Sequence, residues 1–367
     1  METRARVLAG MKKRGLDAIV AVMPENVYYL TGARLLMQRL IPERKTYAVL
    51  TANDRCTLLT AGSDIDPARQ EGTADEVLGV GIVEDATERL GDLLTQLKLA
   101  EAKVAIEFNY LSANDVAVLR KAQPKVSFVP AVEVFQDARL VKLPHEVEAL
   151  RRAEQLQERA ITAAMATSGE GTSEKEMAAR IASNMCLLGA SAVDFVLLQI
   201  GLNSTVFHLA SGDYKAVKGD IVHLDCGGQW PNYRTDLSRN VGIGKVDQKK
   251  KDTYARLWDV QREVVAFIKP GIRVNEAVAR MMELMAKNKL EAPGPYLGHS
   301  VGLSSHEYPE MTPACDIEYQ PGMVFAVEPT TFVKGDARYD IEDTATVTEN
   351  GCELLSGQFH SRDLWVV

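Results

Sequence analysis

Residues 221–230 read IVHLDCGGQW, and residues 232–244 read NYRTDLSRNVGIG. Both segments have the β-branched, alternating composition that is typical of strands. Asp236 follows Asp225 by eleven residues, so two strands joined by a tight turn would bring the two carboxylates together. Two like charges at that distance destabilise a fold unless a cation lies between them, and a divalent metal ion is the usual solution. This stretch therefore predicts both an antiparallel strand pair and a metal site on it.

Alternation along residues 221–230 assigns the neighbours of the first aspartate to the two faces of the strand. His223 shares the face of this aspartate, and we interpret it as a hydrogen-bonded core histidine beside the site. Cys226 points the other way and is expected to be a small core residue. Gly227 and Gly228 are expected to permit the sharp turn between the two strands.

Three further candidate ligands stand in later segments. His299 lies in PYLGHSVGLSSHEYP, residues 295–309, whose glycines let the backbone approach a site closely. Glu328 and Glu342 each interrupt an apolar, strand-like run, where a carboxylate is rarely buried unless it is paired or bound to a metal. Two aspartates, two glutamates and one histidine form a hard donor set that suits Mn(II), Co(II), Fe(II) or Zn(II) and argues against a thiolate zinc site. Four carboxylates carry more charge than one divalent ion neutralises, so the set indicates two ions.

In this order and context, the five residues resemble the ligand signature of the creatinase/prolidase/methionine-aminopeptidase superfamily, which has the pita-bread fold. The resemblance implies that Asp225 chelates one metal ion and that Asp236 and Glu342 bridge two. His299 and Glu328 would then complete the ligands of the second ion. Taken singly, each residue has an ordinary alternative, such as an aspartate that caps a turn or a glutamate on an edge strand.

The resemblance spans residues 195–348, and the layout of the whole chain is similar to that of the prolidase and Xaa-Pro aminopeptidase branch. It implies a homodimeric metallohydrolase, with manganese among the candidate metals, that cleaves the bond before proline with a metal-bridging hydroxide. Glu328 would help to shuttle protons, His208 would contact substrate and His306 would stabilise the tetrahedral intermediate. The alternative for either histidine is a solvated side chain without a role.

Several positions depart from the pattern of this branch. Pro295 stands where many relatives have a histidine, Thr330 where they have a glycine, and Asp340 where they have an arginine. Residues that are two positions apart on one strand point to the same face of the sheet. Asp340 would therefore lie beside Glu342 and repel an anionic substrate tail. Alternatively the strand bulges, Asp340 faces water and Arg338 takes over the role of the cation. Asp340, Pro295 and Arg338 are therefore the candidate specificity residues.

The ligand set leaves more than one function open. It separates the chain from the creatinase branch, which lacks the ligands, but not from hydrolases of small amides or cyclic amidines such as ectoine hydrolase. A lyase relative also exists in the superfamily. A catalytically inactive binding relative is a further alternative, which the intact ligands oppose. We expect a Xaa-Pro peptidase of the prolidase or aminopeptidase P kind, with a small peptide or small amide as its substrate.

The first 135 residues have the pattern of a smaller α/β domain. The runs DAIVAV, TYAVL, CTLLT, KVAIE and VSFVP predict strands, and amphipathic segments at residues 86–97 and 113–121 predict helices. This part contains no histidine, so we expect a scaffold, an oligomerisation surface or a lid.

Residues 136–367 are expected to form the catalytic domain. A long helix is predicted to begin at Pro144, because proline fits the first turn of a helix. Ser173 and Glu176 have the spacing of a capping box at the start of the next helix. The resemblance implies an α+β fold for this domain, with a curved antiparallel sheet flanked by helices.

The composition excludes several classes of protein. The 367 residues include 42 Lys and Arg against 50 Asp and Glu, and an acidic chain without a basic block is a poor binder of nucleic acid. No apolar stretch approaches the roughly 20 residues of a membrane helix. Five scattered cysteines without a CxxC pair indicate a reduced, cytoplasmic protein without disulfides.

Overall fold

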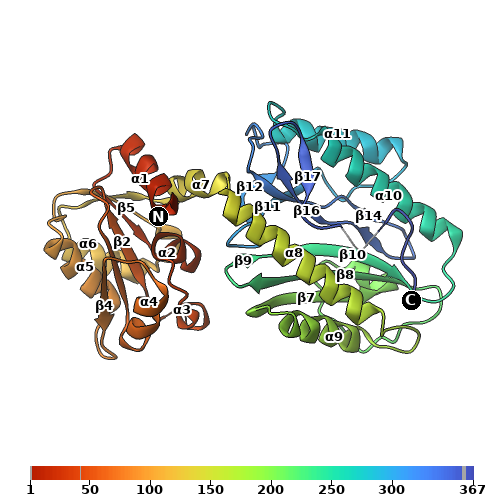
Figure 1. Cartoon of the computed structure of the whole chain (residues 1–367), viewed down its shortest axis with the longest axis horizontal. Helices are drawn as coiled ribbons and strands as arrows, with labels where there is room; N and C mark the ends of the chain where they lie inside the picture. Colours follow the sequence, from red (N-terminus) through yellow and green to blue (C-terminus); the bar gives the residue numbers. More distant parts are fainter. Residues whose placement is uncertain (1, 42, 358–360) are drawn as a thin grey trace. The chain divides into compact units, whose positions relative to one another are not determined.

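The computed structural model describes residues 2–41, 43–357 and 361–367 of the chain. These residues form two compact units, Met1–Arg139 and Leu140–Val367, which follow each other along the colour scale of Figure 1. The boundary that we predicted between residues 135 and 136 falls inside helix α7 (Val132–Leu140). Among the described residues, no helix combines the length and the apolar composition that a bilayer span requires.

The first unit contains a six-stranded mixed sheet in the order β4-β3-β2-β1-β5-β6. Its strands are β1 (Ala18–Ala21), β2 (Tyr47–Thr51), β3 (Cys56–Ala61), β4 (Glu76–Val80), β5 (Lys103–Ile106) and β6 (Ser127–Pro130). Its other helices are α1 (Glu2–Arg14), α2 (Pro24–Thr31), α3 (Leu36–Leu40), α4 (Ile65–Glu71), α5 (Ala86–Gln96) and α6 (Ala113–Ala122). The predicted α/β alternation is confirmed. The sequence analysis missed β4, a half-exposed edge strand that carries no continuous apolar run.

The second unit combines four long helices with antiparallel strands, as expected for its fold class. The helices are α8 (Pro144–Met165), α9 (Glu174–Leu187), α10 (Gln248–Phe267) and α11 (Val274–Lys287). The strands are β7 (Ala192–Ile200), β8 (Ile221–Trp230), β9 (Tyr233–Arg234), β10 (Leu237–Gly242), β11 (Gly298–Ser300), β12 (Glu307–Met311), β13 (Val324–Val327), β14 (Thr330–Phe332), β15 (Arg338–Asp340), β16 (Asp343–Val347) and β17 (Cys352–Leu354). They form sheets in the orders β10-β8-β7, with β9 on β8, then β12-β11-β13-β16-β17, and β14-β15.

Local signals set the starts of the first two helices of this unit. Pro144 occupies the first turn of α8, as predicted. The Ser173 hydroxyl accepts a hydrogen bond from the Glu176 amide, and the Glu176 carboxylate accepts one from the Ser173 amide at 2.8 Å. The predicted capping box is therefore confirmed.

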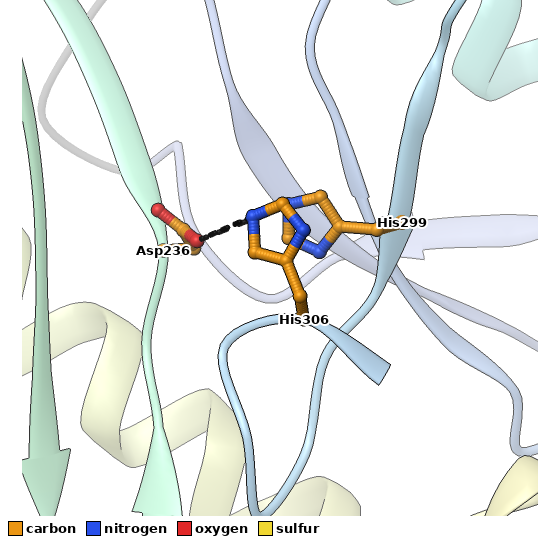
Figure 2. A group of neighbouring side chains, drawn as sticks. All are labelled: Asp236, His299 and His306. Atoms are coloured by element: carbon orange, nitrogen blue, oxygen red, sulfur yellow. Dashed lines mark ion pairs between the residues drawn. The ribbon is translucent and has the colours of Figure 1, made fainter. Parts of the chain in front are cut away.

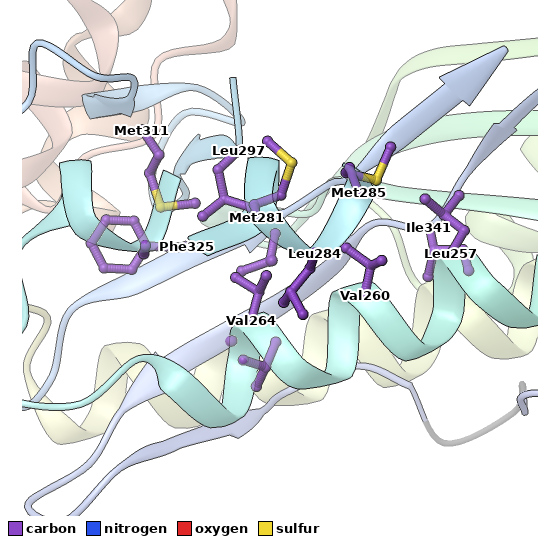
Figure 3. Close-up of a cluster of buried hydrophobic side chains, with 14 of the residues drawn as sticks. Leu257, Val260, Val264, Met281, Leu284, Met285, Leu297, Met311, Phe325 and Ile341 are labelled. Atoms are coloured by element: carbon purple, nitrogen blue, oxygen red, sulfur yellow. The ribbon is translucent and has the colours of Figure 1, made fainter. Parts of the chain in front are cut away.

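Two apolar cores hold the sheets of the second unit in place. One core packs α8 and α9 against β7, β8 and β10. The other lies between α10, α11 and the larger sheet (Figure 3), and its buried members include Leu257, Val260, Val264, Met281, Leu284, Met285, Leu297, Met311, Phe325 and Ile341. Both helix layers therefore lie behind strands that carry candidate ligands.

The prediction that Gly227 and Gly228 form a turn is wrong. Strand β8 continues through both glycines to Trp230. A Cβ at Gly227 would lie 2.6 Å from both the Phe195 ring and the Thr235 carbonyl oxygen, and one at Gly228 would lie 2.5 Å from a methionine methyl group. The glycines are thus required for close packing beside Asp225 rather than for a change of chain direction.

We predict that Gly227→Ala lowers the free energy of unfolding by about 1–3 kcal/mol, the usual cost of overpacking a core. The matched control is Gly351→Ala, where nothing lies within 4 Å of the added Cβ. Chemical denaturation of both variants measures the effect. Equal midpoints for the two variants would contradict the packing explanation.

Candidate metal centre

The candidate ligands come from strands and strand ends of two different sheets. Asp225 lies in β8 and pairs in register with Ser238 of β10. His299 lies in β11, in the larger sheet. Glu342 lies between β15 and β16, and its amide donates to the Ser238 carbonyl at 3.2 Å. This bridge between Ser238 and Glu342 joins the two sheets at the site.

The two glutamates do not interrupt strands as the sequence suggested. Glu328 follows directly after β13, and Glu342 precedes β16. Asp236 likewise lies in the short connection between β9 and β10. These three residues lie at the ends of strands, outside the regular strand pairing. Their carboxylates can therefore turn toward one another without disrupting a sheet.

The structure brings all five residues together in overlapping groups. Asp225, Asp236 and Glu342 each offer an oxygen within 4.8 Å of the others, and so do the donor atoms of His299, Glu328 and Glu342. The Nε2 atom of His299 lies 3.4 Å from a Glu328 oxygen, 3.6 Å from a Glu342 oxygen and 3.8 Å from an Asp236 oxygen. Glu342 belongs to both groups, as a residue between two ions would.

The imidazole of His299 is oriented for ligation. Its Nδ1 lies 3.2 Å from the Ser300 carbonyl, to which it can donate, and this leaves the Nε2 lone pair facing the carboxylates. Burial lowers the pKa of His299 and therefore favours the neutral form that binds metals. His306 stacks on the ring of His299 with 3.5 Å between ring centroids, and its Nε2 lies 3.8 Å from Asp236 (Figure 2).

Among the described residues, no lysine or arginine forms an ion pair with any of the four carboxylates of this cluster, whose ion-pair neighbours are histidines. Burial, and then the neighbouring carboxylates, raise the pKa values of Asp225, Asp236 and Glu328 well above their ordinary range. The same causes raise the pKa of Glu342 to about 8. The buried Oδ1 of Asp225 has no hydrogen-bond partner. Four crowded carboxylates with one neutral imidazole have the donor chemistry that fits divalent cations.

Buried polar residues of α8 and β10 hold the backbone around the ligands. Gln157 donates to the carbonyl of Cys226, the residue after Asp225. Arg239 donates to the carbonyl of Glu342 and forms ion pairs of 2.7 Å with Glu158 and Asp343. Sequence analysis missed these residues, although polar side chains on the inward face of an amphipathic helix were a readable signal.

The cluster opens into a pocket of about 600 Å³. His208 and His306 line it, as do the five candidate ligands. His208 has a positive φ of 56°, which is unusual for a residue other than glycine. Phe195, Leu197, Phe207 and Met281 provide apolar walls. The pocket thus has the mixture of apolar surface and convergent polar groups that is typical of an active site.

The sequence analysis also missed a second carboxylate that lies beside His306. Glu310 Oε1 lies 3.7 Å from His306 Nδ1, and the Tyr296 hydroxyl donates to Glu310 Oε2 at 2.6 Å. The contacts from His306 and Tyr296 lower the pKa of Glu310 and keep it ionised. Glu310 pairs with His299 across β11 and β12, a register that the sequence alone does not reveal.

The three specificity candidates do not line the pocket itself. Asp340 ends β15, and the chain changes sheet before β16, so Asp340 and Glu342 do not share one strand face. Asp340 is only 5% exposed, which excludes the alternative in which it faces water. Of the described residues around the pocket, none is Asp340, Arg338 or Pro295.

His223 is a hydrogen-bonded core histidine, as predicted. It is fully buried, and its Nε2 lies 3.2 Å from the Ser238 hydroxyl and 3.6 Å from Asp340 Oδ2. Its Nδ1 lies 2.9 Å from a guanidinium nitrogen of Arg338. The predicted role of Cys226 as a core residue is also confirmed.

Comparison with known families gives two adjoining matches. Residues 148–349 match Metallopeptidase family M24, and residues 4–141 match the Creatinase/Prolidase N-terminal domain. Together the matches cover nearly the whole chain in the order that the two units follow.

Individual relatives agree with the family matches. The chain is 26% identical to the Xaa-Pro dipeptidase of Pyrococcus horikoshii over 356 residues, which cover 96% of this chain and 95% of the relative. The crystal structure of dipeptidase PepE from Mycobacterium ulcerans is 28% identical with a TM-score of 0.86, covering 100% of this chain and 97% of that one. The X-Pro aminopeptidase from Thermotoga maritima is 25% identical with a TM-score of 0.86, covering 99% of each chain.

We predict that the metal-free protein loses stability as the pH rises. The pKa of Glu342 is raised from 4.5 to about 8, so the folded state binds more protons than the unfolded state in this window. The free energy of unfolding should therefore fall by about 1.4 kcal/mol per pH unit for one such group. Thermal melts at pH 5–8 in chelator measure the slope. Saturating Mn(II) should abolish it, and a metal-independent slope would contradict the prediction.

Proposed function

Because the chain belongs to metallopeptidase family M24, we propose that it is a dinuclear metal-dependent peptidase that cleaves the bond before proline. One observation carries the proposal: four carboxylates, two of them buried and two partly buried, converge with an imidazole in one pocket, and among the described residues none of the four forms an ion pair with a lysine or arginine. The relatives named as Xaa-Pro dipeptidase and X-Pro aminopeptidase support proline as the residue after the cleaved bond.

The proposed metal ligands follow the overlapping groups of donor atoms. Asp225, with Asp236 and Glu342, would hold one ion, and His299 and Glu328 would hold the second together with the two bridging residues. The donor set suits Mn(II), Co(II), Fe(II) or Zn(II). Ions bound there would lower the pKa of water and polarise the scissile carbonyl.

Glu328 is the proposed proton carrier. It lines the pocket, its side chain is 21% exposed, and burial together with neighbouring carboxylates raises its pKa. A carboxylate with a raised pKa can take the proton released when water attacks and deliver it to the departing proline nitrogen. The C–N bond breaks as this nitrogen becomes a secondary amine.

His208 and His306 are the proposed substrate-binding groups. Both line the pocket, and His306 faces Asp236 with its Nε2. The Glu310 carboxylate lies 3.7 Å from Nδ1 and helps to hold the ring in this orientation. His306 Nε2 can then donate to the oxygen that becomes negative during attack on the carbonyl.

We propose a small peptide substrate and a homodimer, in line with the family resemblance. The five cysteines are all free in the structure, which supports a reducing, cytoplasmic location.

We predict that the protein hydrolyses Xaa-Pro substrates when it is supplied with Mn(II) or Co(II). Chelation, which removes the ions, or Asp236→Ala, which removes a proposed bridging ligand, should lower kcat/KM by about 1000-fold or more. Release of proline from a panel of dipeptides and longer peptides measures this. Asp213→Ala, which removes an exposed aspartate of the same unit, is the control. A metal-loaded protein that cleaves small amides but no Xaa-Pro peptide would select the small-amide hydrolase instead.

We predict that Glu310→Gln lowers kcat about tenfold and leaves KM nearly unchanged, because the ring of His306 loses its neighbouring carboxylate while the pocket keeps its shape. Steady-state kinetics on one Xaa-Pro substrate check this. Glu318→Gln alters an exposed glutamate outside the pocket and should have no effect. An equal loss in both variants would show that Glu310 does not act through His306.

A further inference from the structure

Arg338, at the start of β15, is a buried cation without an acidic partner. It is 2% exposed, and its Nε has no hydrogen-bond partner. Within the described parts of the chain, no carboxylate oxygen forms an ion pair with its guanidinium. Arg239 is similarly buried but pairs with both Glu158 and Asp343 at 2.7 Å. Because a buried charge is normally paired, the isolation of Arg338 requires an explanation.

His223 holds this guanidinium but does not neutralise it. Arg338 can only donate, so the His223 Nδ1 at 2.9 Å must be the acceptor, and the ring proton lies on Nε2. With a proton on Nε2 and a lone pair on Nδ1, the imidazole adds no negative charge beside the guanidinium. Asp340 is 3.6 Å from the opposite nitrogen, so the width of the ring separates the two charges.

Arg338 stands directly behind one wall of the candidate active site. Its guanidinium carbon is 4.7 Å from the centroid of the Phe207 ring. Phe207 lines the pocket and is 49% exposed, and its ring meets Phe332 edge-on with centroids 5.3 Å apart.

We propose that Arg338 recognises a carboxylate of the substrate, which enters when the Phe207 ring moves aside. The proposal rests on the proposed peptidase function. When the first residue of a Xaa-Pro dipeptide has a neutral side chain, the only anionic group is the C-terminal carboxylate of the proline. The substrates that Arg338 would favour are therefore dipeptides with a free C-terminus. A guanidinium offers a planar fork of N–H donors that matches a carboxylate, and the partnerless Nε supplies one of them. Without substrate, the face of Phe207 takes the place of the anion.

The test compares Ala-Pro with its C-terminal amide, which lacks the anion. We expect Arg338→Met to lower kcat/KM for the dipeptide about 10- to 100-fold, mainly by raising KM. The same variant should change kcat/KM for the amide by less than about threefold. Arg338→Lys keeps the charge but not the fork and should recover part of the loss. Arg256→Met is the control, because Arg256 is half-buried, donates to the Asn288 carbonyl at 2.8 Å and does not line the pocket; it should not change the ratio between the two substrates.

A binding measurement separates this proposal from the peptidase function itself. Calorimetry with proline and prolinamide should show tighter binding of proline to the wild type and to Arg338→Lys, but not to Arg338→Met. This preference without any turnover would support the carboxylate site and reject the proposed reaction. Hydrolysis of both substrates with equal losses in Arg338→Met, or with none, would overturn the carboxylate site. If Arg338→Met does not fold, equal binding of proline and prolinamide by the wild type would overturn it.

Discussion

Mutual repulsion between buried carboxylates is the constraint on which the second unit depends. Two unit charges about 4 Å apart repel by about 4 kcal/mol at an effective dielectric of 20. Four carboxylates contain several such pairs, and a domain is usually stable by only about 5–15 kcal/mol. The fold therefore requires protons or cations at this point. This requirement explains why two sheets and the ends of several strands meet there, since no single strand could present so many acids to one cation site.

The protein solves the crowding by holding the backbone and leaving the carboxylates free. Gln157 binds the carbonyl next to Asp225, and Arg239 binds the carbonyl of Glu342. Neither of these contacts uses a ligand side chain, and the Asp225 Oδ1 remains without a partner. A set of acids that were all hydrogen-bonded to the protein would be less costly to bury but would be poorer ligands. The buried polar face of α8 thus stabilises the site without competing for the metal.

Local sequence signals were sufficient for most of the elements and for a set of candidate ligands that the fold brings together, but not for the way in which strands end. The alternation of side chains correctly oriented His223 and Cys226 because both lie inside β8. The same rule failed for Asp340 and Glu342, because a period of two holds only within one strand and the chain changes sheet between them. The roles of Gly227 and Glu310 depend on what packs against them from distant segments. Such contacts leave no trace in the spacing of nearby residues.

The departures from the family pattern become coherent when their positions in space are considered. Thr330 lies directly opposite Asp340 across β14 and β15, and His223 lies 3.6 Å from Asp340. The aspartate at position 340 adds a further buried acid near the centre and raises the pKa of Glu342. Arg338, two residues earlier in β15, supplies positive charge on the other side of the His223 ring. A negative charge at position 340 is therefore compatible with this ligand set, since Arg338 on the same strand carries the opposite charge.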